Sequence, residues 1–219
     1  MPVKNLVLFG AGGLARETIP VINAINAVKP TYHLLGFCVE ENYYTPNTMV
    51  GDYPLLGSEQ WLIENKSRVV CCCAVGTPSI RARVQKKLQA EGVIFETVIA
   101  PSASIGERNK IGVGCLLSRN ASISCDCTVG DGVFINGGSG IGHDVILGDY
   151  TCMMGGVRIA GHCTIGEEVY MGGSVFITPN RRIGNRATVA AGSVVFTHVK
   201  EGTTVLGNPA KRMTALESD

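Results

Sequence analysis

The stretch that decides the fold runs from residue 129 to residue 171 and reads VGDGVFINGGSGIGHDVILGDYTCMMGGVRIAGHCTIGEEVYM. An aliphatic residue or methionine occupies every sixth position, and the same step extends in both directions without a slip in register. The sixteen positions are Ile105, Ile111, Leu117, Ile123, Val129, Ile135, Ile141, Leu147, Met153, Ile159, Ile165, Met171, Ile177, Ile183, Val189 and Val195. A six-residue period fits neither an α-helix, with about 3.6 residues per turn, nor a simple alternating strand. It is the period of a hexapeptide β-helix.

Smaller residues recur two positions before each of these, so small and large inward side chains alternate; only Asn109 and Arg181 are large and polar there. Glycine often follows the aliphatic residue, as at Gly142 and Gly148, and we expect it there to permit backbone angles that a side chain would penalise at a corner. Three hexads complete a triangular coil, and parallel coils stack with a rise of about 4.8 Å. The repeat therefore predicts a parallel β-helix of a little more than five coils.

The first half of the chain has a different pattern. Residues 4–9 (KNLVLF) form an apolar strand, Gly10-Ala11-Gly12-Gly13 follows, and residues 14–25 have a helical apolar period. Strand, glycine turn and helix open a doubly wound α/β unit. We therefore predict a small Rossmann-like α/β domain over residues 1–98, followed by the β-helix and a short C-terminal tail over residues 99–219.

Two further strands are expected in the α/β domain, at residues 33–39 and 69–75. The first is followed by Glu40 and Glu41, where nucleotide-binding domains often place a carboxylate, and the second leads to Gly76-Thr77 and a basic helix. The glycine turn directs backbone N–H groups toward an anion such as a phosphate, although tight packing of strand on helix would need the same glycines. A domain of fewer than about 100 residues is small for a complete dinucleotide-binding domain, which favours a mononucleotide or a nucleotide-sugar over NAD.

Composition excludes several functions. Lys and Arg number 19 against 18 Asp and Glu, so nothing in the balance attracts nucleic acid or an anionic membrane. The N-terminus lacks the apolar run of a signal peptide and no stretch is long enough to span a bilayer, which predicts a cytoplasmic protein. The nine cysteines are odd in number and three are adjacent, so we expect small buried hydrophobes instead of disulfides or metal ligands.

His143 is the candidate for acid–base chemistry among only four histidines. It follows Ile141-Gly142 at a corner, from which it would point outward, and a neighbouring carboxylate, Asp144, can fix its tautomer and raise its basicity. A surface histidine with no task would look the same in isolation. His162, nineteen residues later, is expected to lie off the stacking line and to be structural, and the remaining histidines offer no cluster of three imidazoles for zinc.

Seven segments resemble one known family, the bacterial sugar O- and N-acetyltransferases that include sialic acid O-acetyltransferase and the UDP-4-amino-sugar and perosamine N-acetyltransferases. The segments are FGAGGLARE (9–17), GDYPLLG (51–57), AVGTPSIR (74–81), IAPSASIG (99–106), IN (135–136) with HDVILGDY (143–150), IAGHCTIGE (159–167) and GNPAKRM (207–213). The resemblance implies a left-handed β-helix, a homotrimer with active sites between subunits, and acetyl-CoA as cosubstrate without a metal.

The resemblance also implies roles for single residues. His143 would be the general base, supported by Asp144. The expected contacts of the nucleotide-sugar are Gly12, Gly13, Leu14, Glu40, Gly76, Thr77 and Asn136. The expected contacts of acetyl-CoA are Cys152, Gly161, Gly173 and Ala191. Leu14 and Cys152 stand where relatives often have histidine, so base recognition and one cofactor contact are expected to differ.

The expected reaction is direct acetyl transfer to the amine of a nucleotide-linked amino-deoxy sugar, of the UDP-4-amino-4,6-dideoxy type, for bacterial surface glycan synthesis. Backbone N–H groups would stabilise the oxyanion. Two alternatives stay open: an O-acetyltransferase acting on sialic acid or another sugar hydroxyl, and a β-helical binding trimer without turnover.

Overall fold

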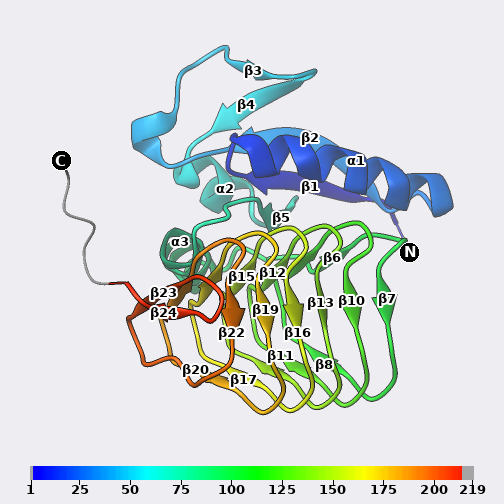
Figure 1. Cartoon of the computed structure of the whole chain (residues 1–219). Helices are drawn as coiled ribbons and strands as arrows, with labels where there is room; N and C mark the ends of the chain where they lie inside the picture. Colours follow the sequence, from blue (N-terminus) through cyan, green and yellow to red (C-terminus); the bar gives the residue numbers. More distant parts are fainter. Residues whose placement is uncertain (1, 214–219) are drawn as a thin grey trace.

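The protein, described here by a computed structural model over residues 2–213, consists of an α/β domain resting on a β-helix (Figure 1). The tail predicted at the C-terminus lies, beyond residue 213, outside the described residues. The predicted fold class, a Rossmann-like α/β domain followed by a left-handed parallel β-helix, is confirmed.

The α/β domain has a five-stranded sheet in the order β3-β4-β2-β1-β5. Its strands are β1 (Lys4–Phe9), β2 (Tyr32–Cys38), β3 (Met49–Val50), β4 (Tyr53–Gly57) and β5 (Val70–Cys73). All are parallel except β3, which is antiparallel to β4. The helices are α1 (Gly13–Val28), α2 (Glu59–Asn65) and α3 (Pro78–Ala90), with a 3-10 turn η1 (Glu41–Tyr43). Helix α1 packs on one face of the sheet, and α2 and α3 pack on the other.

The β-helix has three faces, each a parallel sheet of short strands (Figure 1). The face against the α/β domain, here the domain face, contains β6 (Val98–Ile99), β9 (Leu116–Leu117), β12 (Phe134–Ile135), β15 (Cys152–Met153), β18 (Tyr170–Met171), β21 (Thr188–Val189), β23 (Thr204–Leu206) and the antiparallel β24 (Lys211–Arg212). The second face contains β7 (Ser104–Ile105), β10 (Ser122–Ile123), β13 (Gly140–Ile141), β16 (Arg158–Ile159), β19 (Phe176–Ile177) and β22 (Val194–Val195). The third face contains β8 (Lys110–Ile111), β11 (Thr128–Val129), β14 (Ile146–Leu147), β17 (Thr164–Ile165) and β20 (Arg182–Ile183).

Two corners of this prism matter for function. The glycine corner joins the domain face to the second face and contains residues 136–139, 154–157, 172–175 and 190–193. The histidine corner joins the second face to the third and contains residues 124–127, 142–145, 160–163 and 178–181. Because the histidine corner joins the two faces that the α/β domain leaves uncovered, it lies on the opposite side of the prism from that domain.

The repeated aliphatic residues form one continuous core. Ile135, Ile141 and Leu147 are at most 4% exposed, and each strand pairs with the strand eighteen residues later, as in Ile123 with Ile141. The smaller inward residues fill the corners, where Ser139 Oγ donates to the Met154 carbonyl oxygen at 2.7 Å. The predicted domain boundary, between residues 98 and 99, falls within β6. Because β6 pairs with β9, it is already part of the β-helix.

The expected reason for the corner glycines is wrong. Gly142 and Gly172, which directly follow aliphatic residues, do not have positive φ angles. A Cβ atom at Gly142 would instead lie 2.7 Å from the backbone nitrogen of Gly161 on the next coil. These glycines are therefore required by the close approach of successive coils, and the left-handed conformation falls two residues later, for example at Asp144 (φ 57°) and His162 (φ 58°).

A buried arginine fixes the α/β domain on the β-helix. Arg81 of α3 is fully buried. Its guanidinium donates to the carbonyl oxygens of Cys73, Val75, Gly114 and Gly132. The first two belong to the α/β domain and the last two to the β-helix, so one side chain ties both parts together. Leu116, Phe134 and Cys152 of the domain face share a core with β1 and α1.

Candidate active site

His143 and Asp144 form an exposed pair at the histidine corner, immediately after β13. His143 Nδ1 lies 2.8 Å from Asp144 Oδ2, and the two side chains are 54% and 46% exposed. If Nδ1 carries the ring proton and donates a hydrogen bond to the carboxylate, Nε2 keeps its lone pair. That tautomer is the one a general base needs.

The ring of His143 leans over the next coil, onto a residue without a side chain. A Cβ atom at Gly161 would lie 2.6 Å from Cε1 and 2.7 Å from Nε2 of His143. Gly161, predicted as a cofactor contact, is therefore beside the candidate base, and only glycine leaves room for the ring in this orientation.

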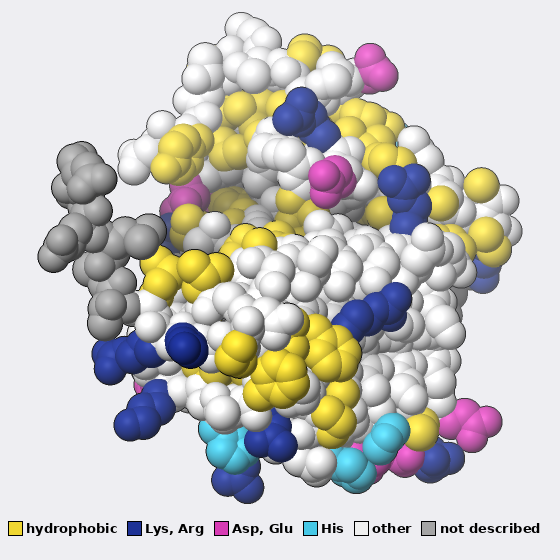
Figure 2. Space-filling view, viewed as in Figure 1, with side chains coloured by type: hydrophobic (Ala, Val, Ile, Leu, Met, Phe, Trp, Pro, Cys, Tyr) yellow, Lys and Arg dark blue, Asp and Glu magenta, His cyan; other side chains and the backbone are white. Residues whose placement is uncertain are grey.

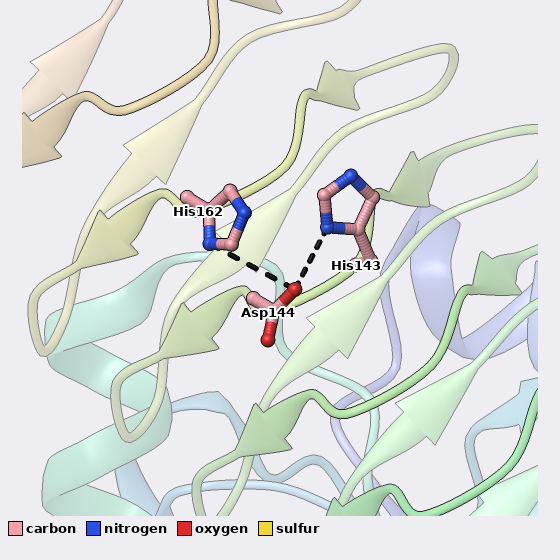
Figure 3. A group of neighbouring side chains, drawn as sticks. All are labelled: His143, Asp144 and His162. Carbon is pink, nitrogen blue, oxygen red and sulfur yellow. Dashed lines mark hydrogen bonds and ion pairs between the residues drawn. The ribbon is translucent and has the colours of Figure 1, made fainter.

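His162 lies off the stacking line of His143, as expected, since it follows Asp144 by one coil, but its side chain nevertheless joins the same group. Its ring packs edge-on against His143 with centroids 4.9 Å apart, and its Nδ1 lies 3.7 Å from Asp144 Oδ2. Figure 3 shows both rings turned toward the same carboxylate. Within residues 2–213 these three side chains make up the one group of His, Cys, Asp and Glu close enough to hold a metal ion.

The residues predicted to bind the nucleotide-sugar lie on the other side of the prism. Gly12 and Gly13 end the first turn and begin α1, and a Cβ atom on either would meet nothing within 4 Å. The turn is therefore open to a ligand. Leu14 lies 3.8 Å from the Cβ position of Gly76, and Met154 of the glycine corner lies 3.9 Å from it, so this turn reaches the β-helix.

A pocket of about 350 Å³ lies at the carboxyl ends of β1 and β2, where doubly wound sheets bind ligands. Gly10, Gly12, Glu40 and Tyr43 are among its lining residues. Glu40 is held by Arg83 of α3, whose Nη1 lies 2.6 Å from its Oε1. The pocket is thus built around two of the predicted substrate contacts.

Asn136, Gly173 and Ala191 all lie at the glycine corner. Asn136 lines a pocket of about 280 Å³ together with Glu17 of α1 and Arg119. A Cβ atom at Gly173 would lie 3.3 Å from the Gly155 carbonyl oxygen one coil earlier, and Ala191 follows one coil later. The predicted substrate residues and these two cofactor residues thus share one side of the molecule, whereas His143, Asp144 and Gly161 lie at the opposite corner.

Two predicted contacts lie elsewhere. Cys152 does not fit its expected role, because its side chain points from the domain face into the core shared with the α/β domain and is fully buried. Burial raises the pKa of this thiol to about 12. Thr77 precedes α3 and lines a separate pocket with Tyr170 and Arg186.

A basic pocket of about 360 Å³ at the end of the β-helix was not predicted from the sequence. Its lining includes His198, Lys200, Lys211 and Arg212. The last two belong to the GNPAKRM segment, so the clustering of cations there was the available signal.

Comparison with known proteins agrees with this architecture. Residues 5–88 match the family model of the PglD N-terminal domain. The acetyltransferase domain of PglB from Neisseria gonorrhoeae is 25% identical, with a TM-score of 0.84 over 96% of this chain and 100% of that one. WeeI from Acinetobacter baumannii is 26% identical, with a TM-score of 0.84 over 95% and 99%.

A third structure, a mutant of perosamine N-acetyltransferase from Caulobacter crescentus in complex with CoA and GDP-perosamine, has the same fold. It is 23% identical, with a TM-score of 0.86 over 98% of this chain and 99% of that one. Among curated protein sequences, none matched the chain closely enough to count as a relative.

The chain shares the fold of the hexapeptide-repeat acyltransferases. Within that class, the predicted resemblance to the sugar acetyltransferases with a PglD-type N-terminal domain is confirmed. No helix in the described part of the chain is long and apolar enough to cross a membrane.

Proposed function

We propose that this protein transfers an acetyl group from acetyl-CoA to the amine of a nucleotide-linked amino-deoxy sugar, of the UDP-4-amino-4,6-dideoxy type. The reaction would take place in the cytoplasm and serve bacterial surface glycan synthesis. The observation that carries the proposal is the exposed His143–Asp144 pair at a bare β-helix corner. The likeness to the PglB acetyltransferase domain, which has also been solved with acetyl coenzyme A, supports the donor.

The proposed chemistry is a single direct transfer. The neutral amine attacks the thioester carbonyl carbon while His143 Nε2 accepts a proton from the amine nitrogen. The tetrahedral oxyanion needs a hydrogen-bond donor, and the N–H of Gly161, close beneath the ring, is the candidate. The C–S bond then breaks, and the proton on His143 passes to the departing CoA thiolate.

No cysteine is proposed as a nucleophile. Eight of the nine thiols are buried, and none of the nine, all within the described residues, forms a disulfide. Burial raises the pKa of Cys38 and Cys72 to about 12 and of Cys115 to about 11, so these thiols stay protonated at neutral pH. Activation of the sugar amine by His143 needs no deprotonated thiol.

The active site is proposed to lie between subunits of a homotrimer. In one chain the open glycine turn and His143 lie on opposite sides of the prism, so a sugar held by the turn would reach the base of a neighbouring copy. An apolar patch on the second face supports such packing (Figure 2). The exposed apolar side chains on and next to this face include Phe176 of β19 and Phe196, which directly follows β22, and they are 42% and 50% exposed.

The remaining predicted contacts complete the proposal. Gly12, Gly13, Leu14, Glu40, Gly76, Thr77 and Asn136 stay proposed for the nucleotide-sugar. Gly161, Gly173 and Ala191 stay proposed for acetyl-CoA. We add the pocket of Lys200, Lys211 and Arg212 for the CoA phosphates, because three cations line it.

A substrate screen tests this function. The full-length protein is incubated with acetyl-CoA and UDP-, GDP- or CMP-linked amino sugars, with the matching hydroxy sugars and free sialic acid as controls. We expect one amino sugar to raise the melting temperature and to gain one acetyl group by mass spectrometry. Acetylation of free sialic acid alone would favour the O-acetyltransferase, and binding without CoA release would favour a non-catalytic trimer.

A further inference from the structure

We propose that His143, Asp144 and His162 form a binding site for a divalent transition-metal ion such as Zn²⁺, and that the bound ion switches the candidate base off. The site rests on the geometry of three side chains. Only its inhibitory consequence rests on the proposed function, which makes His143 the base. No residue outside this group is required as a protein ligand.

The three side chains already converge. One potential ligand atom from each lies within 4.8 Å of the other two. Asp144 Oδ2 is 2.8 Å from Nδ1 of His143 and 3.7 Å from Nδ1 of His162. Zinc binds nitrogen and oxygen at about 2.0–2.2 Å, so two ligands on one tetrahedral ion lie roughly 3.4 Å apart. The side chains therefore need to move by about an ångström or so, and their exposure leaves them free to turn.

The backbone beneath them is fixed by the stacking of the coils. The backbone nitrogen of His162 donates to the His143 carbonyl oxygen at 3.0 Å, and that of Asp144 donates to the Cys125 carbonyl oxygen at 3.1 Å. Asp144 and His162 occupy the same left-handed position in consecutive coils. Metal binding would thus order only side-chain torsions, because the Cα positions are preorganised.

The donor set selects the kind of ion. Two imidazoles and one carboxylate suit Zn²⁺ and its transition-metal neighbours, whereas Mg²⁺ and Ca²⁺ prefer oxygen ligands throughout. The carboxylate one coil earlier, Asp126, is already held by Arg108, with two contacts of 2.7 Å that lower the pKa of Asp126. Asp144 is therefore the carboxylate available to an ion at this corner.

Occupation of the site would block catalysis for a simple reason. An ion bound at Nδ1 of His143 forces the ring proton onto Nε2, so Nε2 loses the lone pair that must accept the proton of the sugar amine. The ion also neutralises Asp144, which orients the ring. Chelation would restore the free base, so inhibition would be reversible.

The first arm of the test measures metal binding without substrate. Zn²⁺ alone is titrated by calorimetry into the full-length protein and into His162→Gln, which leaves the His143–Asp144 pair intact. Both carry Cys125→Ser, since Cys125 is the one cysteine that is not buried and could bind zinc itself. We expect one ion per chain and at least about tenfold weaker binding in His162→Gln.

The second arm measures acetyl transfer with and without zinc for each protein, followed by chelator. We expect zinc to inhibit the parent far more than His162→Gln. Equal zinc affinity of the two proteins, or no binding by the parent, would overturn the metal site. If zinc binds as expected but no acetyl transfer exists in either protein, the proposed function fails and the metal site stands.

Discussion

Residues eighteen apart in sequence occupy the same place in consecutive coils, and two such columns at the histidine corner contain the candidate site. Cys125, His143 and Gly161 form one, and Asp126, Asp144 and His162 form the other. A large ring at one level of the first column therefore needs a small residue at the next. Gly161 provides that space, which makes it a positioning residue for the candidate base.

Substitution Gly161→Ala should displace the ring of His143, because the new Cβ would lie 2.6 Å from Cε1. We expect the rate of acetyl transfer to fall by about 10- to 100-fold, since a misplacement near 1 Å has that effect on a positioned group. Steady-state kinetics measures the fall, and the melting temperature serves as control. Unchanged kinetics in a folded variant would show that the ring position does not matter.

The sequence predicted His143 and Asp144 but not His162, and the columns explain the difference. His143 and Asp144 are neighbours along the chain, so their pairing needed no knowledge of stacking. His162 stacks on Asp144, not on His143, and meets the His143 ring only because that ring leans over Gly161. Side-chain direction within a corner is not contained in the repeat period.

Some corner residues have a strained backbone, which affects the stability of the coils. Several corners place a residue with a side chain in the left-handed region, for example Glu168 at φ 54°. Glycine adopts that conformation without the penalty of a Cβ atom, which is about 1–2 kcal/mol. The neighbouring Glu167 does not have a positive φ angle, so it provides a matched control.

We expect Glu168→Gly to raise the free energy of unfolding by about 0.5–1 kcal/mol, as relief of the strain exceeds the extra entropy of glycine in the unfolded chain. Glu167→Gly should lower the free energy of unfolding by a similar amount, because it relieves no strain and only increases the entropy of the unfolded chain. Urea denaturation of both variants measures the difference. Loss of stability in both would mean that the corner is not strained.

Arg81 is the side chain through which α3 holds the β-helix. Arg81→Met keeps the length of the side chain but removes a donor from four carbonyl oxygens, of which, among the described residues, only that of Gly114 keeps another side-chain donor, Gln85 Nε2 at 3.3 Å. We expect destabilisation of about 3 kcal/mol or more, measured by denaturant unfolding. Arg83→Met, on the exposed side of the same helix, should have a much smaller effect. Equal destabilisation by the two substitutions would show that Arg81 is not the side chain that holds α3 on the β-helix.

The strands and helices that could be predicted from the sequence are those with a regular spacing of apolar residues. The six-residue step predicted the strands of the β-helix, and the strand at residues 4–9 and the helix at 78–91 were close to β1 and α3. The hairpin of β3 and β4 and the helix α2 were not predicted, because segments of two to seven residues are too short to establish a period. The role of the corner glycines was misjudged because contact between coils depends on the stacked structure.

The whole molecule places the two proposed half-sites, the open glycine turn and His143, on opposite sides. The open glycine turn lies with the α/β domain against the domain face, and His143 lies at the corner opposite that face. The chain's shape alone therefore favours sites shared between subunits. The apolar Phe176 and Phe196 on the uncovered faces offer the surface for that assembly.

Subunit complementation tests the shared site. Gly12→Val should fold, since its Cβ meets nothing within 4 Å, but should fill the space for a phosphate. We expect Gly12→Val and His143→Ala trimers to be inactive alone. After an equal mixture of the two variants is unfolded and refolded, about one quarter of the wild-type activity should return. Random assembly places an intact glycine turn beside an intact His143 at about one quarter of the subunit boundaries. A mixture that stays inactive would place both half-sites in one chain.

Whether His143 is the base for acetyl transfer can be decided from one kinetic quantity. It is the rate of CoA release from acetyl-CoA in the presence of the nucleotide amino sugar found by screening, compared between wild type and His143→Ala at equal trimer concentration. Loss of a general base predicts a fall of about 100- to 10,000-fold with an unchanged melting temperature. Release by the folded variant at a rate near that of the wild type would contradict the account.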